Sequence, residues 1–208
     1  MQKSQFSQFT QYGVATVYEA AGQKGLIDAP LVQIQPGSKA AGPARTILCG
    51  QSDNLMVHAG LAEAQPGEVL VITMPEPEAI SLVGDLLAFQ ARVRQVAAIL
   101  VNGAVRDTDA LRKLGLPVWS RWVRARAATK NKVGVLNQPV EVCGITISNG
   151  DIIVLDADGA VAIPQEEAET VLEAARQREA REEKLVSQLQ QGALTYDLHG
   201  LRARVEGR

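Results

Sequence analysis

The chain has 208 residues, of which 46% are hydrophobic and 21% charged, so it is long enough to bury the core of one globular domain. Its 21 basic residues nearly balance its 23 acidic residues, and a formal net charge of −2 provides no field for capturing nucleic acid or an anionic membrane. We therefore expect neither nucleic acid nor a membrane to be a partner of this chain.

The amino terminus and the cysteines indicate where the protein resides. Residues 1–10 are rich in Gln and Ser and lack the apolar core of a secretory signal, and no apolar run reaches the roughly 18 residues of a membrane-spanning helix. Cys49 and Cys143 lie in apolar surroundings without the spacing of a zinc site, which is typical of buried thiols. These features predict a cytoplasmic protein.

The first half of the chain alternates predicted helices with predicted strands. Residues 68–73 form a continuous apolar run, which is typical of a strand covered on both faces. Asp53 occupies an expected helix N-cap, and Gly103 is expected to open a turn. The strand–helix–strand order predicts a parallel sheet. The predicted elements are a helix at 15–20, a strand at 41–49, a helix at 54–64, a strand at 68–73, a helix at 84–93 and a strand at 97–101.

The second half is predicted to be rich in strands and to end in a long helix. Residues 133–147 alternate apolar and polar positions. Pro164 precedes a charged segment, 165–191, that has the pattern of a helix with a narrow apolar stripe. No linker divides the chain, so residues 1–208 are predicted to form a single α/β domain. The further predicted elements are a helix at 108–114, a strand beginning at 116–119 and hairpin strands at 152–155 and 160–163.

Polar residues follow the predicted strands at the sheet edge where ligands of α/β proteins bind. Gly84 begins a predicted helix, and the amides that follow it, including those of Leu86 and Leu87, have no partner within the helix. Such amides bind a carboxylate or a phosphate. The same pattern is also typical of an ordinary helix start.

A second polar feature is the pair Arg106-Asp107, in the turn after a predicted buried strand. Arginine can clamp an oxyacid through two parallel hydrogen bonds, and aspartate supplies the hard oxygen that a divalent cation prefers. The pair therefore suggests an oxyacid bound beside a metal. The alternative is structural, with Arg106 in a salt bridge and Asp107 capping the helix that begins at Thr108.

Three acidic residues, Glu19, Asp85 and Glu182, are candidates for proton transfer or for contacts around the metal. Glu182 lies among other charged residues, which is typical of a solvated helix face. His58 and His199 show no metal-ligand spacing and are predicted to be structural.

These residues carry a resemblance to a known family. The chain resembles the class II pyruvate aldolases that cleave 4-hydroxy-4-methyl-2-oxoglutarate and 4-carboxy-4-hydroxy-2-oxoadipate, a family that includes the regulator of ribonuclease activity A. The most specific signature is a glycine separated from an Arg-Asp pair, here Gly84 and Arg106-Asp107. The similar segments span nearly the whole chain in order and lie at 15–20, 53–58, 84–87, 103–107, 116–119 and 158–164.

The resemblance implies an α-β-β-α sandwich that assembles as homotrimers or homohexamers, with each active site between subunits. It implies that Arg106 binds the pyruvyl oxygen and that Asp107 holds Mg²⁺ or Mn²⁺. The amides of Leu86 and Leu87, next to Gly84, are implied to hold the substrate carboxylate.

The resemblance also assigns the acidic residues. Glu19 and Glu182 match positions that the family donates from an adjacent subunit, so the helix at 165–191 is expected to contact a neighbour. Asp85 matches an acidic position beside a metal-bound water. One departure is Ala110, which stands where the family usually has a carboxylate three residues after the motif aspartate, with Asp109 one residue early.

The implied activity is a metal-dependent retro-aldol cleavage that releases pyruvate through an enolate, with oxaloacetate decarboxylation as a side activity. A Schiff-base route is not expected, because Lys130 and Lys132 lie in a polar stretch that would not lower the pKa of an amine. A non-catalytic regulator of ribonuclease is the alternative. A methyltransferase finds no support, since the chain lacks the glycine-rich loop of a nucleotide-like cofactor.

Overall fold

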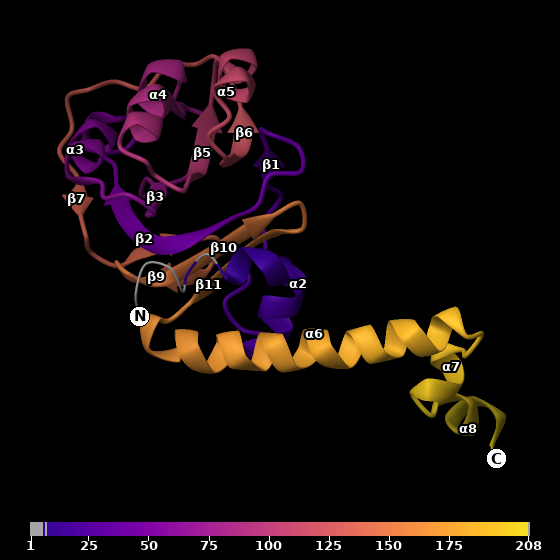
Figure 1. The fold of residues 1–208 in the computed structure, drawn as a ribbon. Coiled ribbons are helices and arrows are strands. Elements are labelled where there is room, and N and C mark those ends of the chain that lie inside the picture. The colour runs from indigo at the N-terminus through magenta and orange to yellow at the C-terminus, as the bar shows by residue number, and fades with distance from the viewer. Residues whose placement is uncertain (1–5, 7, 208) are drawn as a thin grey trace.

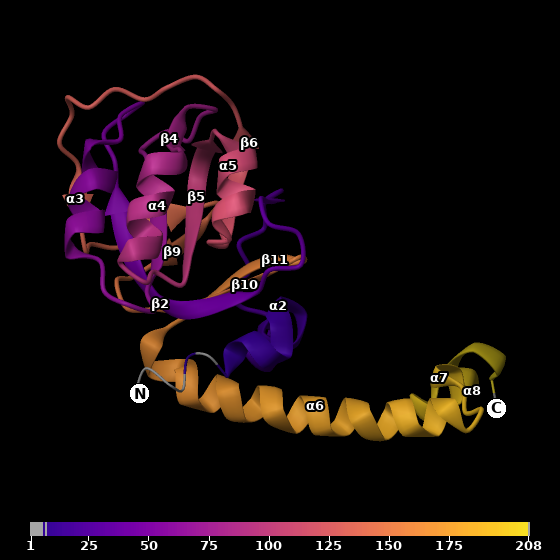
Figure 2. The same ribbon diagram turned by 45° about the horizontal axis from the view of Figure 1, so that its top comes forward.

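A computed structural model describes residue 6 and residues 8–207 of the chain as an α-β-β-α sandwich (Figure 1). Three helices cover one outer face, and two further helices lie against the opposite face (Figures 1 and 2). The strands between them form a curled, nine-stranded sheet together with a small two-stranded one. The predicted α/β class and layer order are confirmed.

Four parallel strands form the half of the sheet that carries the candidate site. They run in the order β6-β5-β3-β2, and every residue of β3 and β5 is buried, as continuous apolar runs require. Their carboxyl ends therefore point to one edge. The strands are β2 (Ala40–Leu48), β3 (Val69–Thr73), β5 (Ala98–Val105) and β6 (Val118–Val123), with β1 (Val32–Gln33) antiparallel to β6.

Strand β2 belongs to both halves of the curled sheet. Its residues 44–48 pair with β3, whereas its residues 40–43 pair with the antiparallel strand β10. The chain is tightly packed at this change of partner, because a Cβ on Gly42 would lie 2.2 Å from the carbonyl oxygen of Gly67. The second half contains β10 (Ile152–Asp156) and β11 (Gly159–Ile163), while β7 (Val135–Leu136) extends the end of β2 and β8 (Val140–Val142) pairs with β9 (Ile145–Ile147).

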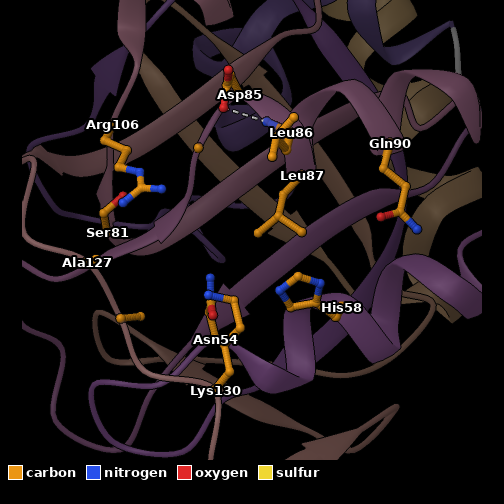
Figure 3. A pocket seen from close by; sticks show the side chains of 12 residues that line it. Asn54, His58, Ser81, Asp85, Leu86, Leu87, Gln90, Arg106, Ala127 and Lys130 are labelled. Carbon is orange, nitrogen blue, oxygen red and sulfur yellow. Dashed lines mark hydrogen bonds between the residues drawn. The ribbon is translucent and has the colours of Figure 1, made fainter.

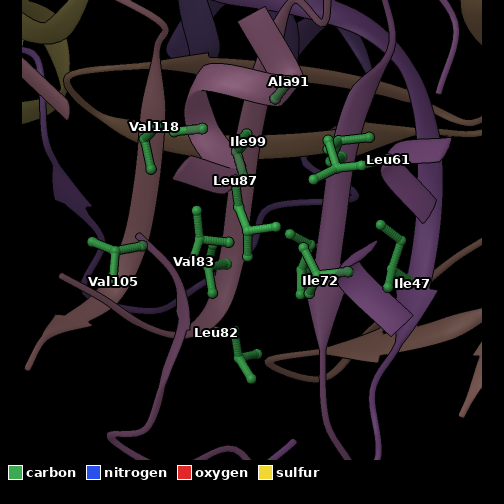
Figure 4. Close-up of a cluster of buried hydrophobic side chains, with 14 of the residues drawn as sticks. Ile47, Leu61, Ile72, Leu82, Val83, Leu87, Ala91, Ile99, Val105 and Val118 are labelled. Atoms are coloured by element: carbon green, nitrogen blue, oxygen red, sulfur yellow. The ribbon is translucent and has the colours of Figure 1, made fainter. Parts of the chain in front are cut away.

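Three hydrophobic clusters fill the spaces between the four layers. The first lies between the parallel strands and the helices α3 (Leu55–Glu63), α4 (Asp85–Val93) and α5 (Thr108–Leu114), and Figure 4 shows Leu61, Leu87 and Ile72 within it. The second joins the two halves of the sheet and contains Trp119, whose Nε1 donates a 2.9 Å hydrogen bond to the carbonyl oxygen of Asp156. The third packs β10 and β11 against helix α2 (Phe9–Ala20) and the start of α6 (Ala168–Gln190).

Several predicted boundaries are wrong for identifiable reasons. Strand β5 does not end at residue 101 with a turn at Gly103 but continues to Val105, with an irregularity between Val101 and Ala104. Between the predicted strand at 68–73 and the predicted helix at 84–93, the structure contains a further strand, β4 (Ser81–Val83), which pairs with β5. Helix α2 begins at Phe9, well before the predicted residue 15, and is kinked at Gly13. The predicted core thiol of Cys143 is only partly buried, whereas Cys49 is fully buried.

The carboxyl-terminal helix extends beyond the sandwich. Its first two turns pack on α2 and β11 through Val171, Leu172 and Ala175, which are buried. The remainder projects away from the body and carries two short helices at its end, α7 (Thr195–Leu198) and α8 (Leu201–Glu206) (Figure 1). The predicted helix at 165–191 is thus present, preceded by a 3₁₀ turn at Gln165–Glu167.

Asp53 has a larger role than the N-cap predicted for it. Asn54 occupies the N-cap position of α3, and Asp53 lies one residue earlier with its Oδ1 accepting a 2.8 Å hydrogen bond from the Leu55 amide. Its Oδ2 accepts bonds from the Thr129 hydroxyl and from the amides of Asn131 and Lys132. The buried carboxylate therefore fixes the distant segment 129–132 beside the start of α3.

The lowered pKa of Asp53 allows its role in fixing segment 129–132 to be tested through the pH dependence of stability. Burial raises the pKa, but the hydrogen bonds from Thr129, Asn131, Leu55 and Lys132 outweigh burial and lower it from 3.8 to about 2. The charged form is therefore favoured by folding, and this stabilisation is complete above about pH 4 and is lost as the pH falls toward about 2. In urea unfolding, the loss of stability caused by Asp53→Asn should be largest near neutral pH and should shrink below about pH 4. A difference that does not change with pH would contradict this role.

Candidate functional site

A pocket of about 200 Å³ opens at the edge where the parallel strands end (Figure 3). One wall is the loop after β5 and the amino terminus of α4, and the other is the beginning of α3 with the segment 127–130. The polar and apolar residues that line it are Asn54, His58, Ser81, Gly84, Asp85, Leu86, Leu87, Gln90, Arg106, Ala127, Ala128 and Lys130.

Gly84 and the Arg106-Asp107 pair meet in direct contact at the rim of this pocket. Oδ2 of Asp107 accepts a hydrogen bond from the amide of Asp85 at 3.3 Å, and Nε of Arg106 lies 3.3 Å from the same oxygen. A Cβ on residue 84 would lie only 2.6 Å from Oδ2 of Asp107 and 3.1 Å from Nε of Arg106. The absence of a side chain at Gly84 is therefore what allows the pair to approach α4.

Asp107 has a backbone conformation that directs its carboxylate toward this contact. Its φ of 57° and ψ of 38° are left-handed, a region that costs most residues about 1–2 kcal/mol and that aspartate tolerates better than most. It occupies the N-cap position of α5, yet its side chain makes no capping hydrogen bond to that helix. The structural alternative of a capping Asp107 is therefore correct in position but not in hydrogen bonding.

The ion pair between Arg106 and Asp107 is accessible. Their side chains are 45% and 38% exposed, and a pair in contact with water contributes at most about 1 kcal/mol. A ligand can therefore replace part of this interaction at low cost. The guanidinium fork of Arg106 can bind an oxyacid, while the carboxylate of Asp107 can bind a cation.

The amides at the start of α4 are only partly available. Gly84 is the N-cap of α4 and has no side chain to cap the helix, but the Asp85 amide already donates to the Asp107 carboxylate. The Leu86 amide likewise donates a 2.8 Å hydrogen bond to Oδ1 of Asp85. The Leu87 amide lies in the first turn, where no acceptor exists within the helix. An anion would therefore use the Leu86 amide only after the Asp85 carboxylate rotates away.

Glu19 and Glu182 lie together, but far from the pocket of their own chain. Arg178 joins them, with one guanidinium nitrogen 2.6 Å from Glu19 and Nε 2.8 Å from Glu182. They belong to α2 and α6, the layer opposite to α3, α4 and α5 (Figure 1). The structure thus unites Gly84, Asp85, Leu86, Leu87, Arg106 and Asp107 within one chain and separates Glu19 and Glu182 from them.

Seven of the twelve pocket residues were not predicted from the sequence to belong to the site, and three of these, Asn54, His58 and Lys130, lie opposite Arg106 (Figure 3). Asn54 was not singled out, His58 was predicted to be structural, and Lys130 was placed in an exposed polar stretch. Lys130 is exposed as expected, but it lines the pocket with Asn54 and His58. The signal that could have found them is Asp53, whose hydrogen bonds bring 129–132 beside α3.

The residues near Asp107 offer few ligands to a metal. The described residues contain no group of three or more His, Cys, Asp or Glu placed to hold an ion. Asp107 and Asp85 supply two carboxylates, which suits Mg²⁺, because this ion usually keeps several waters and uses one or two carboxylates. Asp109 does not replace the carboxylate missing at Ala110, because it is 91% exposed and pairs with Arg112 at 3.2 Å.

Fold and site together define an α/β sandwich protein with an arginine-aspartate pair at the mouth of a pocket beside the amino terminus of a helix. A family model described as RraA-like, Aldolase/RraA, matches residues 14–162. The chain belongs to this family. Within the described part of the chain, no helix is long and apolar enough to cross a membrane.

Individual relatives agree with this assignment. A protein of Halalkalibacterium halodurans, provisionally named as a 4-hydroxy-4-methyl-2-oxoglutarate aldolase, is 32% identical over 173 residues, which cover 83% of this chain and 80% of the relative. Streptomyces coelicolor RraAS2, described as an unusual member of the RNase ES inhibitor RraA family, has a TM-score of 0.78 at 27% identity and covers 88% of this chain and 96% of its own. An uncharacterised protein of Pseudomonas syringae pv. tomato shares the fold, with a TM-score of 0.85 at 23% identity and coverage of 93% and 92%.

The contact at Gly84 predicts that Gly84→Ala weakens metal binding without disturbing the fold. The φ of −129° and ψ of −169° at Gly84 are extended and open to any residue, so Gly84→Ala should fold normally. Its methyl group would displace the Asp107 carboxylate and Arg106. We expect Mn²⁺, titrated by calorimetry, to bind the variant at least about tenfold more weakly, which corresponds to about 1.4 kcal/mol. An unchanged Mn²⁺ affinity in a variant of unchanged melting temperature would show that the contact is irrelevant to metal binding.

Proposed function

We propose that the protein is a divalent-metal-dependent class II aldolase that cleaves 4-hydroxy-4-methyl-2-oxoglutarate or 4-carboxy-4-hydroxy-2-oxoadipate and releases pyruvate. The observation that carries the proposal is the contact of Gly84 with the Arg106-Asp107 pair at a pocket lined by helix amides. The relative from Halalkalibacterium halodurans supports the same activity through its name. Decarboxylation of oxaloacetate is the proposed side activity, because loss of CO₂ from it also leaves pyruvate enolate.

The residues of the chain have defined tasks in this reaction. In the retro-aldol step, the C4 hydroxyl loses its proton, the C3–C4 bond breaks, and its electron pair moves into the C2 carbonyl to form the enolate. Arg106 binds the 2-oxo acid and stabilises the negative charge that develops on the C2 oxygen. The Leu87 amide, and the Leu86 amide once Asp85 has turned away, hold the C1 carboxylate. Protonation of the enolate at C3 then gives pyruvate.

The proposed cofactor is Mg²⁺ or Mn²⁺ held by Asp107, with Asp85 beside it contacting a water of the ion. When bound there, the cation supplies a positive charge that favours the enolate. The donor set fits such an ion, because both carboxylates are exposed at the rim and neither forms an ion pair stronger than an exposed one. A structural zinc site would require more nitrogen or sulfur ligands than this rim contains.

We further propose that the site is completed in a homotrimer or homohexamer, where Glu19 and Glu182 of one subunit reach the pocket of another. Arg178 holds these two carboxylates next to each other, so both would arrive at the neighbouring site together. The projecting part of α6, which carries Glu182, is free to coat another subunit (Figure 2). A carboxylate arriving in this way would serve as the base for the C4 hydroxyl.

The alternative function is a protein-binding regulator of ribonuclease, which the likeness to Streptomyces coelicolor RraAS2, an unusual member of the RNase ES inhibitor family, supports. Such a role requires neither a bound cation nor an open pocket. The contact at Gly84 therefore favours the aldolase. Either function is compatible with a cytoplasmic location, where the two free cysteines, Cys49 and Cys143, would remain reduced.

The proposed activity depends on the charge of Asp107. Asp107→Asn keeps the size of the side chain and a residue that tolerates the left-handed backbone, but removes the anionic metal ligand. We expect Mg²⁺-dependent pyruvate release from 4-hydroxy-4-methyl-2-oxoglutarate to fall at least about a thousandfold, or about 4 kcal/mol of barrier. Wild-type protein that releases no pyruvate from any 4-hydroxy-2-oxo acid with Mg²⁺ or Mn²⁺ would favour the regulator.

The shared site is tested by subunit mixing. Arg106→Ala and Glu182→Ala should each be inactive alone, because one lacks the oxyacid clamp and the other the base. If each site is shared, hybrids contain some sites with an intact Arg106 from one subunit and an intact Glu182 from the other, and activity returns. Hybrid oligomers that form, as shown by native mass spectrometry, and remain inactive would rule out the shared site. Mixing Arg106→Ala with Asp107→Asn is the control, since these residues lie on the same chain and the site cannot be restored.

A further inference from the structure

We infer that the half of the pocket opposite Arg106 recognises a second carboxylate of the substrate through Lys130, and that Asn54 positions the Lys130 ammonium. This inference rests on the proposed function, because it assigns residues to the part of the substrate that Arg106 does not bind. It would explain how the enzyme selects among 4-hydroxy-2-oxo acids by the group at C4.

The two halves of the pocket lie across from each other. Arg106 and Asp85 are on one side of Figure 3, whereas Asn54, His58 and Lys130 are on the other, with Leu87 between them. The lining contains two cationic side chains, Arg106 and Lys130, and one acidic side chain, Asp85. With a divalent cation at the Asp107 rim, the pocket suits a ligand with two negative charges better than one with a single charge.

Lys130 is the cation of its segment that remains available to a ligand. Residues 124–132 contain four basic residues and no acidic one. The side chain of Lys132 donates to the Gln51 carbonyl at 2.8 Å, and that of Arg124 donates to the Val123 carbonyl at 2.8 Å. The pKa of Glu78 is lowered mainly by hydrogen bonds from Ser52 and Gln51. The positive charge of Arg126 lowers it further, so Arg126 interacts with this carboxylate. Lys130 forms no ion pair within the described part of the chain, and of the four it is the one that lines the pocket.

Independent evidence for this arrangement is that the side-chain oxygen of Asn54 is buried without a hydrogen-bond donor among the described residues. The residue is buried, with 8% of its surface exposed, and its Nδ2 donates a 3.0 Å hydrogen bond to the Leu82 carbonyl. This bond fixes the orientation of the amide. Its Oδ1 then accepts no hydrogen bond from any residue that the structure describes. A buried acceptor without a donor is unfavourable, so this oxygen requires a donor from the pocket.

The Lys130 ammonium can provide both the donor that Asn54 lacks and the positive charge that a second carboxylate needs. It has three donors, so it can donate to Oδ1 of Asn54 and to a ligand carboxylate at the same time. The backbone beside it is already fixed, because the amides of Asn131 and Lys132 are bound by the buried Asp53. Little ordering of the backbone is therefore needed when the carboxylate binds. Asn54 is a positioning residue in this arrangement, and Lys130 is the residue that contacts the substrate.

The test compares two substrates that differ only in the second carboxylate. They are 4-hydroxy-4-methyl-2-oxoglutarate and 4-hydroxy-4-methyl-2-oxopentanoate, in which a methyl group replaces that carboxylate. Lys130→Met should raise the KM for the first acid at least about tenfold and leave that for the second within about twofold. The matched control is Lys132→Met, which removes a lysine of the same segment that is bonded to Gln51. It should leave the ratio of the two KM values unchanged.

Asn54 is tested in combination with Lys130. Asn54→Ala should raise the KM for the dicarboxylate less than Lys130→Met does, and it should add nothing further in the Lys130→Met background, because it acts through the ammonium. Lys130→Arg should recover part of the preference, since it restores the charge. Additive effects of the two substitutions would overturn the positioning role of Asn54.

A binding measurement separates this inference from the proposed activity. With Mg²⁺ present, calorimetry should show that Lys130→Met weakens binding of 2-oxoglutarate about tenfold and that of 2-oxobutanoate little. Equal loss for both acids, or equal effects of Lys130→Met and Lys132→Met, would overturn the inference. If the wild type releases no pyruvate from any acid, the proposed aldolase fails, and the calorimetric comparison still decides whether Lys130 binds a second carboxylate.

Discussion

The contact between the Asp107 carboxylate and the amino terminus of α4 holds the candidate site together. It joins the end of β5 to the end of β4, two strands that are neighbours in the sheet but separated along the chain by α4. A side chain at residue 84 would occupy the space of this carboxylate. Gly84 and the Arg106-Asp107 pair are therefore far apart in the sequence but form one contact in space.

A second anchor determines the opposite wall of the pocket. The carboxylate of Asp53 binds three backbone amides and one hydroxyl, and it does so with its pKa lowered to about 2, so it stays charged at any physiological pH. The two walls are thus built in similar ways, each by one aspartate that binds backbone donors of another segment. Asp107 is exposed at the rim and accessible to ligands, whereas Asp53 is fully buried and is structural.

The sequence predicted the elements whose signals are local. The continuous apolar run of β3 and the hairpin of β10 and β11 were placed within one or two residues, because burial and turn residues act over short distances. Features that depend on partners far along the chain were missed. Strand β4 exists because it pairs with β5, and Lys130 reaches the pocket because Asp53 holds its segment. The metal, the substrate and the sharing of the site between subunits remain predictions, since a single chain does not test them.

Because β2 pairs with both β3 and β10, the sheet cannot be completed early in synthesis of the chain. Residues 40–43 pair with residues 152–155, so this part of the sheet must wait until more than 100 further residues have been synthesised. The parallel strands can assemble earlier, but the face that bears Val71, Leu100 and Trp119 stays uncovered until the later hairpins arrive. The nascent protein therefore passes through a stage with a large apolar surface, when chaperones would be most needed.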